Sequence, residues 1–207
     1  RDRYIPRIKW TASPDFLAII RLNRLQNVVD VLLANSLNGN TTILYHEEND
    51  RFISEVDDNY IYFTGDNRYF LIRSERSGFF HYYLHSMDGT LINPVTKGDW
   101  EVDRFLGVDE TKELMYFTST TETPLQRQLY SVKLDGSDRK KISLKSGHVE
   151  AEFSKTYAYF INTWSDANTP PVISIHQSDG KQIRMLVDNS KLLFDIKKYG
   201  FSKKEFI

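Results

Sequence analysis

"FTGDNRYFLIRSERSGFFHYYLHSMDGTLINPVTKGDWEV", residues 63–102, is the stretch whose pattern decides the fold. It begins with a turn that contains Asp66, and a polar bend at Gly78 then separates two apolar runs. A tight Asp88-Gly89 turn leads from the second run to a third. Two-residue periodicity interrupted by Asp-Gly is a strong hairpin signal. The stretch therefore predicts an antiparallel meander of three or four strands.

The same turn recurs along the chain as "SLNGN", "SMDGT", "KLDGS" and "QSDGK", with glycines at Gly39, Gly89, Gly136 and Gly180. Successive glycines lie 50, 47 and 44 residues apart. A second turn followed by an apolar run precedes each of them, in "TASPDFLAIIRLN", "FTGDNRYFLIRSE", "GVDETKELMYFTS" and "EFSKTYAYFINTW". Blades of β-propellers repeat at about 40–50 residues. We therefore expect an all-β chain, a β-propeller fragment of about four antiparallel blades with a short C-terminal helix.

The domain organisation follows from these repeats. We expect residues 1–207 to form a single partial propeller domain, with blades at approximately 6–50, 51–97, 98–146 and 147–187, and with a helix and connector over 188–207. In the last segment, Asp188 and Ser190 are candidate helix caps, Lys197 and Lys198 would lie in the last turn, and Gly200 would follow the helix. The final "EFI" has the pattern of a strand that begins there.

Composition excludes several classes of protein. Basic and acidic residues nearly cancel, 27 against 28, so no net field attracts nucleic acid or an anionic membrane. No apolar run approaches the roughly 20 residues of a membrane span. The absence of cysteine removes disulfides and thiolate ligands, and it is compatible with the cytosol and with a bacterial envelope alike. Because "RDRYIPRIKW" lacks a methionine and a signal sequence, we expect an excised fragment or a mature piece.

Motifs of catalysis and metal binding are missing from the sequence. The strained serine turn of an α/β-hydrolase needs G-x-S-x-G, and "GFSKK" departs from it at the last position. His81 and His85 would share one face of a helix, but in the predicted strand "HYYLH" they are about 13 Å apart, too far for one ion. We expect them to be histidines of the polar face of that strand. We expect no metal site and no cofactor.

The acidic run Glu47-Glu48, followed by Asp50, is the sharpest charged cluster. Adjacent carboxylates can bind a cationic ligand or share a proton, although such a run is more often the solvated end of a loop.

Three residues are candidates for contacts between blades. Trp100 and Glu101 begin the third predicted blade, where a tryptophan usually packs between neighbours. Arg127 in "PLQRQLY" could satisfy a carbonyl or carboxylate of a neighbouring blade.

Four segments carry a family resemblance: "KGDWEV", "MYFTSTTETPLQRQLYSVKLDG", "INTWSDANTPPV" and "VDNSKLLFDIKKYGFSKKEFI". The chain resembles the N-terminal propeller domain of dipeptidyl peptidase IV, and most of all the bacterial branch of these prolyl-oligopeptidase-family serine exopeptidases. The resemblance implies an eight-bladed propeller that caps an α/β-hydrolase domain and an enzyme that releases Xaa-Pro or Xaa-Ala dipeptides from peptide N-termini. It places the catalytic triad C-terminal to Ile207 and the paired amino-group-binding glutamates upstream of Arg1. Glu47-Glu48 does not match the surroundings of that pair.

One further family feature falls within the chain. In the vertebrate enzymes a loop near the start of the equivalent of the second blade brings a tryptophan and a Phe-Arg pair to the extended substrate pocket. The corresponding stretch is about 51–58, which makes Arg51, Phe52 and Val56 candidates for the wall of the pocket. Phe52 would stand for the tryptophan, but no Phe-Arg pair follows it.

We therefore expect a non-catalytic cap that restricts access to a dipeptidyl peptidase and shapes its peptide pocket. The expected partners are peptide substrates, a C-terminal α/β-hydrolase domain and, in a homodimer, a second copy of the protein. We expect no nucleic-acid partner and no membrane span. The resemblance implies a periplasmic or cell-envelope location. The alternative is a non-enzymatic propeller that serves as an interaction platform, since fold does not fix function. An enzyme with a site in the propeller's own funnel would need converging carboxylates or ligands, and the repeats contain no such set in equivalent positions.

Overall fold

The computed structural model describes residues 3–54, 56–200 and 204 of the chain. These residues form four antiparallel sheets of four strands each and one helix. The chain divides into two compact units, Arg1–Gly98 and Asp99–Ile207, each of which holds two of the sheets. The prediction of an all-β propeller fragment with a short C-terminal helix is confirmed.

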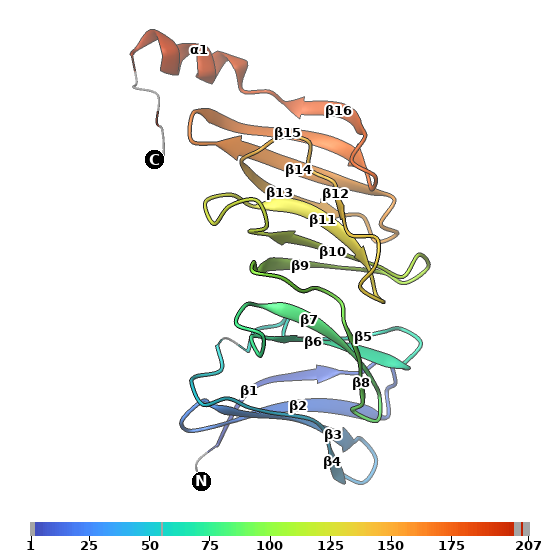
Figure 1. Cartoon of the computed structure of the whole chain (residues 1–207). Helices are drawn as coiled ribbons and strands as arrows, with labels where there is room; N and C mark the ends of the chain where they lie inside the picture. Colours follow the sequence, from blue (N-terminus) through green and yellow to red (C-terminus); the bar gives the residue numbers. More distant parts are fainter. Residues whose placement is uncertain (1–2, 55, 201–203, 205–207) are drawn as a thin grey trace. The chain divides into compact units, whose positions relative to one another are not determined.

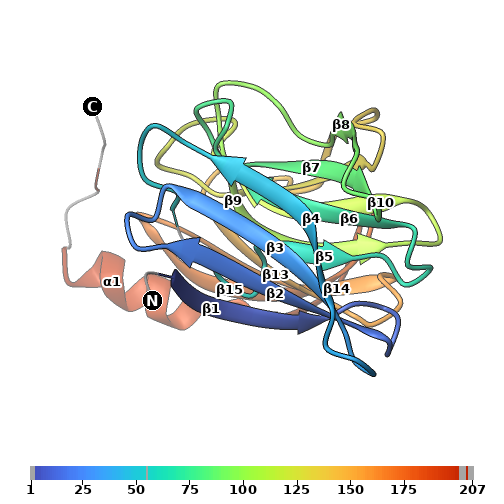
Figure 2. The ribbon, with the colours of Figure 1, turned by 90° about the horizontal axis from the view of Figure 1, so that it is seen from below.

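The first unit contains two meanders in which each strand pairs with the next one along the chain (Figure 1). The first sheet consists of β1 (Arg3–Trp10), β2 (Phe16–Asn23), β3 (Val28–Asn35) and β4 (Thr41–Glu48). The second consists of β5 (Ile61–Phe63), β6 (Tyr69–Ser74), β7 (His81–Ser86) and β8 (Leu91–Pro94). Figure 2 shows β1 to β4 side by side in this order.

The second unit repeats the arrangement. Its sheets consist of β9 (Val102–Asp109), β10 (Leu114–Ser119), β11 (Gln128–Lys133) and β12 (Lys140–Lys141), and of β13 (His148–Phe153), β14 (Tyr159–Asp166), β15 (Thr169–Gln177) and β16 (Gln182–Val187). β1 begins at Arg3, before the expected start of the first blade. The exact limits of the blades and the single domain stay predictions.

The four Asx-Gly turns connect the third and fourth strands of the sheets, as the sequence predicts. In each turn a side-chain oxygen accepts a hydrogen bond from the backbone N–H two residues later, which closes the loop locally. The pairs are Asn38 and Asn40 at 2.9 Å, Asp88 and Thr90 at 2.9 Å, Asp135 and Ser137 at 2.8 Å, and Asp179 and Lys181 at 2.9 Å. The following glycine has φ between 72° and 96° in all four copies, where a side chain would be strained.

Two of these turns also fix the packing between neighbouring sheets. A Cβ added at Gly89 would overlap the backbone oxygen of Leu44 in the first sheet, and one at Gly180 would lie 2.6 Å from the backbone oxygen of Ile142. The backbone of each turn therefore touches the outer part of the sheet that precedes it. Only a glycine permits so close an approach.

A histidine four residues before each of these glycines supports the turn. His85 places Nδ1 3.0 Å from the carbonyl oxygen of Gly89, and His176 places Nδ1 2.9 Å from that of Gly180. Each ring stacks on a phenylalanine, at 5.1 Å between centroids for Phe70 and 5.2 Å for Phe160. Both imidazoles are buried.

Apolar side chains that alternate along the strands form the core of the first unit. The fully buried ones include Ala18, Val29, Val31, Phe70 and Ile72. Because side chains of a strand alternate between faces, the buried set of β2 and β3 lies on the side that packs against the second sheet. This packing holds the strand ends, and with them the connecting loops, in place.

The helix α1 spans Ser190–Lys198, with Lys197 and Lys198 in its last turn as expected. Its N-cap is Asn189, in a left-handed conformation and without a side-chain cap, so the expected capping is only partly correct. Asp188 accepts a hydrogen bond from the N–H of Ser190 at 3.0 Å. The expected strand at "EFI" lies outside the described residues. Within the described part of the chain, no helix is long and apolar enough to cross a membrane.

Candidate functional site

The loop between β4 and β5, residues 49–60, presents an aromatic and a cationic side chain to solvent. Phe52 is 59% exposed and Arg51 is also exposed. A large apolar side chain that stays open to water beside a guanidinium suits contact with a ligand or partner. We call residues 51–52 the loop tip.

The N-terminal limb of the loop rests on the turn between β2 and β3. The N–H of Asn49 donates to the carbonyl of Asn27 at 2.9 Å, and the N–H of Ile53 donates to that of Gln26 at 2.6 Å. Between them, the N–H of Arg51 donates to Oδ1 of Asn49 at 2.9 Å. Backbone hydrogen bonds on both sides therefore bracket the loop tip.

The C-terminal limb of the loop is held by β1. Lys9 Nζ donates to the carbonyls of Asp58 at 3.1 Å and Ile61 at 2.8 Å, and Arg7 pairs with the Asp58 carboxylate at 2.8 Å. Burial lowers the pKa of Lys9, and the charges of Asp58 and Asp57 partly oppose this effect. A partly buried ammonium that donates to two carbonyls fixes the direction in which the chain enters β5.

Beneath the loop, the carboxylate of Glu47 lies in a polar cluster. Its side chain is only 8% exposed and accepts hydrogen bonds from the hydroxyls of Ser74, at 2.7 Å, and Tyr45. Arg76 approaches it to 3.6 Å and lies over the ring of Tyr83, with its guanidinium carbon 4.3 Å from the centroid. Glu47 is thus neither the solvated loop end that we expected nor a free cation ligand. Its neighbours Glu48 and Asp50 are exposed.

A small cavity of about 10 Å³ adjoins this cluster. Its lining includes Glu47, Tyr60, Arg73 and Ser74. The hydroxyl of Tyr60 is buried and has no hydrogen-bond partner among the described residues. Burial raises the pKa of Tyr60 well above its ordinary value, and the nearby Tyr45 and Glu47 add to the effect. The hydrogen bonds of Glu47 with Ser74 and Tyr45 make this polar cluster a rigid support under the loop.

The three predicted pocket-wall residues are therefore placed differently. Arg51 and Phe52 form the exposed loop tip, whereas Val56 is buried in the core of the first unit together with Ile53. The wall that the tip would form stays a prediction.

Trp100 and Glu101 lie in the second unit, before β9. The indole is half-buried and stacks on Phe117 with centroids 6.0 Å apart, while Arg139 lies over its ring at 4.9 Å. The backbone of Glu101 exchanges hydrogen bonds with Thr120, its N–H donating to Oγ1 at 3.1 Å and its carbonyl accepting from the N–H at 3.2 Å. Their role between blades stays a prediction.

Arg127 lies where the two sheets of the second unit meet. Its backbone N–H donates to the carbonyl of Gly147 at 3.1 Å, and its carbonyl accepts from the N–H of Val149 at 2.9 Å. Its side chain remains within its own sheet, where Nε is 2.5 Å from Asp103. The link to the next sheet is thus made by the backbone, and the guanidinium stabilises the position of this segment.

His81 and His85 are buried, so the expectation that they lie on a polar face was wrong. His81 contacts Thr96 Oγ1 and the carbonyl of Gly98, each at 3.0 Å, and is fully buried. Both histidines serve the packing of β7 rather than a ligand. The described residues contain no group of three or more His, Cys, Asp or Glu side chains that could hold a metal ion.

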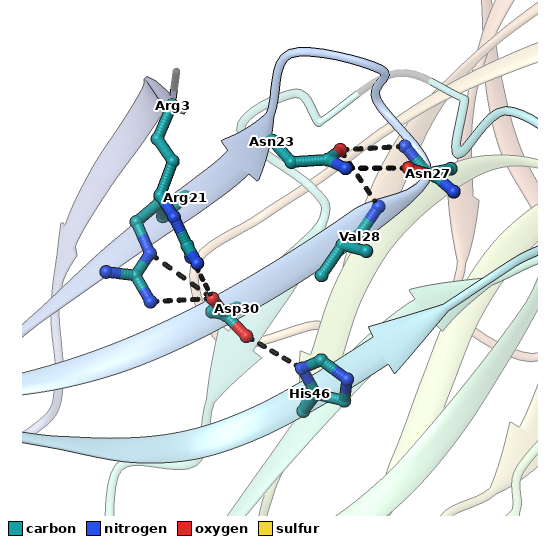
Figure 3. A network of polar contacts seen from close by, with 7 residues as sticks. All are labelled: Arg3, Arg21, Asn23, Asn27, Val28, Asp30 and His46. Atoms are coloured by element: carbon teal, nitrogen blue, oxygen red, sulfur yellow. Dashed lines mark hydrogen bonds and ion pairs between the residues drawn. The ribbon is translucent and has the colours of Figure 1, made fainter. Parts of the chain in front are cut away.

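Sequence reasoning missed a network around Asp30, in which all four strands of the first sheet take part (Figure 3). The carboxylate of Asp30 is 2.7 Å from Arg3 Nη1, Arg21 Nη2 and His46 Nδ1. Burial alone would raise its pKa, but the hydrogen bonds from His46, Arg21 and Arg3 outweigh it and lower the pKa. A single charged residue inside the apolar run "VVDVLLA" was the available signal.

The comparisons with known proteins agree with this architecture. The family model of the dipeptidyl peptidase IV (DPP IV) N-terminal region matches residues 1–171. The solved structure of Porphyromonas gingivalis dipeptidyl peptidase 4 is similar with a TM-score of 0.88 and 35% identity, over 94% of this chain and 28% of that one. The probable dipeptidyl peptidase 4 of Aspergillus flavus is 27% identical over 96% of this chain, and the inactive dipeptidyl peptidase 10 of Mus musculus is 27% identical over 99% of it. The chain spans 27% of the length of each of these two relatives.

Proposed function

The chain belongs to the family of the dipeptidyl peptidase IV N-terminal region, and we propose that it is the non-catalytic propeller portion of a serine peptidase of this kind. In this role it forms part of a cap that restricts access to a hydrolase domain and shapes the peptide pocket. The parent enzyme would release Xaa-Pro or Xaa-Ala dipeptides from peptide N-termini. The observation that carries the proposal is the match over residues 1–171, supported by the 35% identity to a solved dipeptidyl peptidase 4.

The loop tip supports a contact with substrate. Arg51 and Phe52 stay exposed while both limbs of their loop are hydrogen-bonded to neighbouring strands and turns. Binding loses less conformational entropy when the backbone that carries the contacting side chains is held in advance. We infer that Phe52 packs against the side chain of the N-terminal residue of the peptide and that Arg51 lies beside Phe52 at the wall of the pocket.

The described residues offer no peptidase machinery of their own. Ser174 Oγ and His176 Nε2 are 2.8 Å apart, which resembles the nucleophile and base of a triad. Both side chains are buried, at 3% and 7% exposure, and the imidazole's second nitrogen contacts the carbonyl of Gly180. This pair supports the turn of the fourth sheet. The chemistry of the parent enzyme would come from its hydrolase domain, without a cofactor.

The proposed partners follow from the same family membership. They are peptide substrates, a C-terminal α/β-hydrolase domain and a second copy of the enzyme in a homodimer. We propose a periplasmic or cell-envelope location for the parent protein, where peptides from outside the cell are available.

The second candidate function is an interaction platform without catalysis. It is favoured by the similarity to a relative whose name describes it as inactive. The two candidates differ in the activity of the parent protein, because a platform would not turn over a dipeptide substrate.

The test uses the full-length parent enzyme and Gly-Pro and Phe-Pro p-nitroanilides. We expect it to hydrolyse both and the isolated chain of 207 residues to hydrolyse neither. Phe52→Ala should lower kcat/KM for Phe-Pro more than for Gly-Pro, because only the first substrate has a side chain for the ring to contact. Leu37→Ala is the matched control, since Leu37 is 87% exposed in the turn between β3 and β4. An inactive parent protein would contradict the peptidase function and would support the second candidate, the interaction platform without catalysis.

A further inference from the structure

Two backbone carbonyls accept the hydrogen bonds that hold the N-terminal limb of the loop between β4 and β5. Both carbonyls belong to the turn between β2 and β3. The carbonyl of Gln26 accepts from Ile53 at 2.6 Å and that of Asn27 accepts from Asn49 at 2.9 Å. These two bonds lie on either side of the loop tip, Arg51 and Phe52. The direction in which the two carbonyls point therefore determines where the tip stands.

The shape of this turn depends on one side chain, that of Asn23. Its Oδ1 accepts from the backbone N–H groups of Asn27 at 3.0 Å and Val28 at 3.1 Å, and its Nδ2 donates to Oδ1 of Asn27 at 2.7 Å (Figure 3). The carbonyl of Asn23 also accepts from the N–H of Gln26 at 3.0 Å. One residue thus makes four hydrogen bonds across a turn of four residues, 24–27.

The turn needs this support because its backbone is strained. Gln26 has φ of 55°, in the left-handed region, which is unfavourable for residues other than glycine. Such a conformation persists only where the surrounding bonds over-determine it. Without the Asn23 side chain, Gln26 can return to a relaxed conformation, and its carbonyl then turns away from Ile53.

We propose that Asn23 is a positioning residue for substrate selection: it fixes the turn at Gln26 and Asn27 and thereby sets the loop tip against the N-terminal residue of the peptide. Asn23 itself contacts neither Arg51 nor Phe52 through any of these bonds, so it acts through the backbone of the turn. The inference rests on the proposed contact between the tip and the substrate.

The experiment measures kcat/KM of the full-length enzyme for Phe-Pro and Gly-Pro p-nitroanilides and takes their ratio. Gly-Pro has no first side chain, so the ratio cancels general damage to the protein. Asn23→Ala should lower the ratio about fivefold, the equivalent of about 1 kcal/mol, mainly through KM for Phe-Pro. Asn23→Asp keeps the accepting oxygen and should retain most of the ratio.

Asn38→Ala is the matched control for the loss of a turn asparagine. Asn38 makes the same kind of bond, to the N–H of Asn40 at 2.9 Å, in the turn between β3 and β4, and we expect no change in the ratio. Should Asn23→Ala not fold, Asn23→Ser, whose hydroxyl reaches fewer donors, takes its place with a smaller expected loss.

The outcomes separate this inference from the proposed function. If Phe52→Ala lowers the ratio while Asn23→Ala leaves it unchanged, the positioning role of Asn23 is overturned and the contact of the tip stands. If both variants leave the ratio unchanged, the proposed contact between the loop tip and the substrate is refuted. The positioning role of Asn23, which depends on that contact, is then refuted as well. A loss in Asn23→Ala that Asn23→Asp restores supports the inference.

Discussion

Replacing Gly89 by alanine tests whether the Asx-Gly turns fix the packing between sheets. Gly89 has φ of 90°, and a Cβ there would overlap the backbone oxygen of Leu44 in the first sheet. The left-handed conformation costs an alanine about 1–2 kcal/mol. Forcing extra volume into a packed contact costs about 1–3 kcal/mol more. The turn cannot relieve the overlap by a side-chain movement, because the obstacle is backbone.

The equivalent turn of the first sheet provides the control. Gly39 has φ of 72° and nothing within 4 Å of an added Cβ, so Gly39→Ala carries the conformational cost without the overlap. We expect a loss of about 1–2 kcal/mol for Gly39→Ala and of about 2–5 kcal/mol for Gly89→Ala. Gly78→Ala, with φ of 97° and open space, should resemble Gly39→Ala.

The measurement is the free energy of unfolding in urea, extrapolated to water, for the purified chain and its variants. The difference between Gly89→Ala and Gly39→Ala then isolates the contact with Leu44. Equal losses in the two variants would refute the reasoning, because they would show that the sheets do not meet at this turn. Gly180→Ala repeats the test in the second unit, where the Cβ would lie 2.6 Å from the oxygen of Ile142.

Three other perturbations test the packing elsewhere. Gly107→Ala should destabilise the second unit by about 2–4 kcal/mol, because φ is 120° and the Cβ would overlap the Tyr157 hydroxyl. Calorimetry of the double variant Gly107→Ala, Tyr157→Phe should show that part of this loss is recovered, because the second change removes the hydroxyl. Trp100→Ala should cost about 1–3 kcal/mol in urea unfolding, since the half-buried indole stacks on Phe117, and a change below about 0.5 kcal/mol would contradict that packing. Burial lowers the pKa of His85 from 6.5, so the unfolded chain binds the proton more tightly than the folded chain does. The contribution of His85 to the free energy of unfolding should be full above about pH 6.5 and should be lost as the pH drops through the folded pKa. A pH profile of unfolding no steeper than that of His85→Phe would contradict this.

The candidate site was only partly predictable, for reasons that particular residues make clear. The family resemblance pointed to the stretch 51–58, and the structure places Arg51 and Phe52 at an exposed tip. The same stretch predicted Val56 beside them, but this side chain packs into the core of the first unit. The bonds that hold the loop come from Gln26 and Lys9, and spacing along the chain contains no information about such long-range partners.

The repeat, the turns and the fold class were determined by the sequence alone, because hairpin geometry depends on residues that are neighbours in the chain. An Asx-Gly pair needs only its own side-chain oxygen and its own flexible backbone to form the turn, and all four copies form it. Only the tertiary structure decided which polar groups are buried. Glu47 and His85 occupy positions that a lone strand would leave in water, and both are covered because the first and second sheets pack face to face within one unit. Burial is a property of two surfaces that meet, and residues far apart in the sequence form those surfaces.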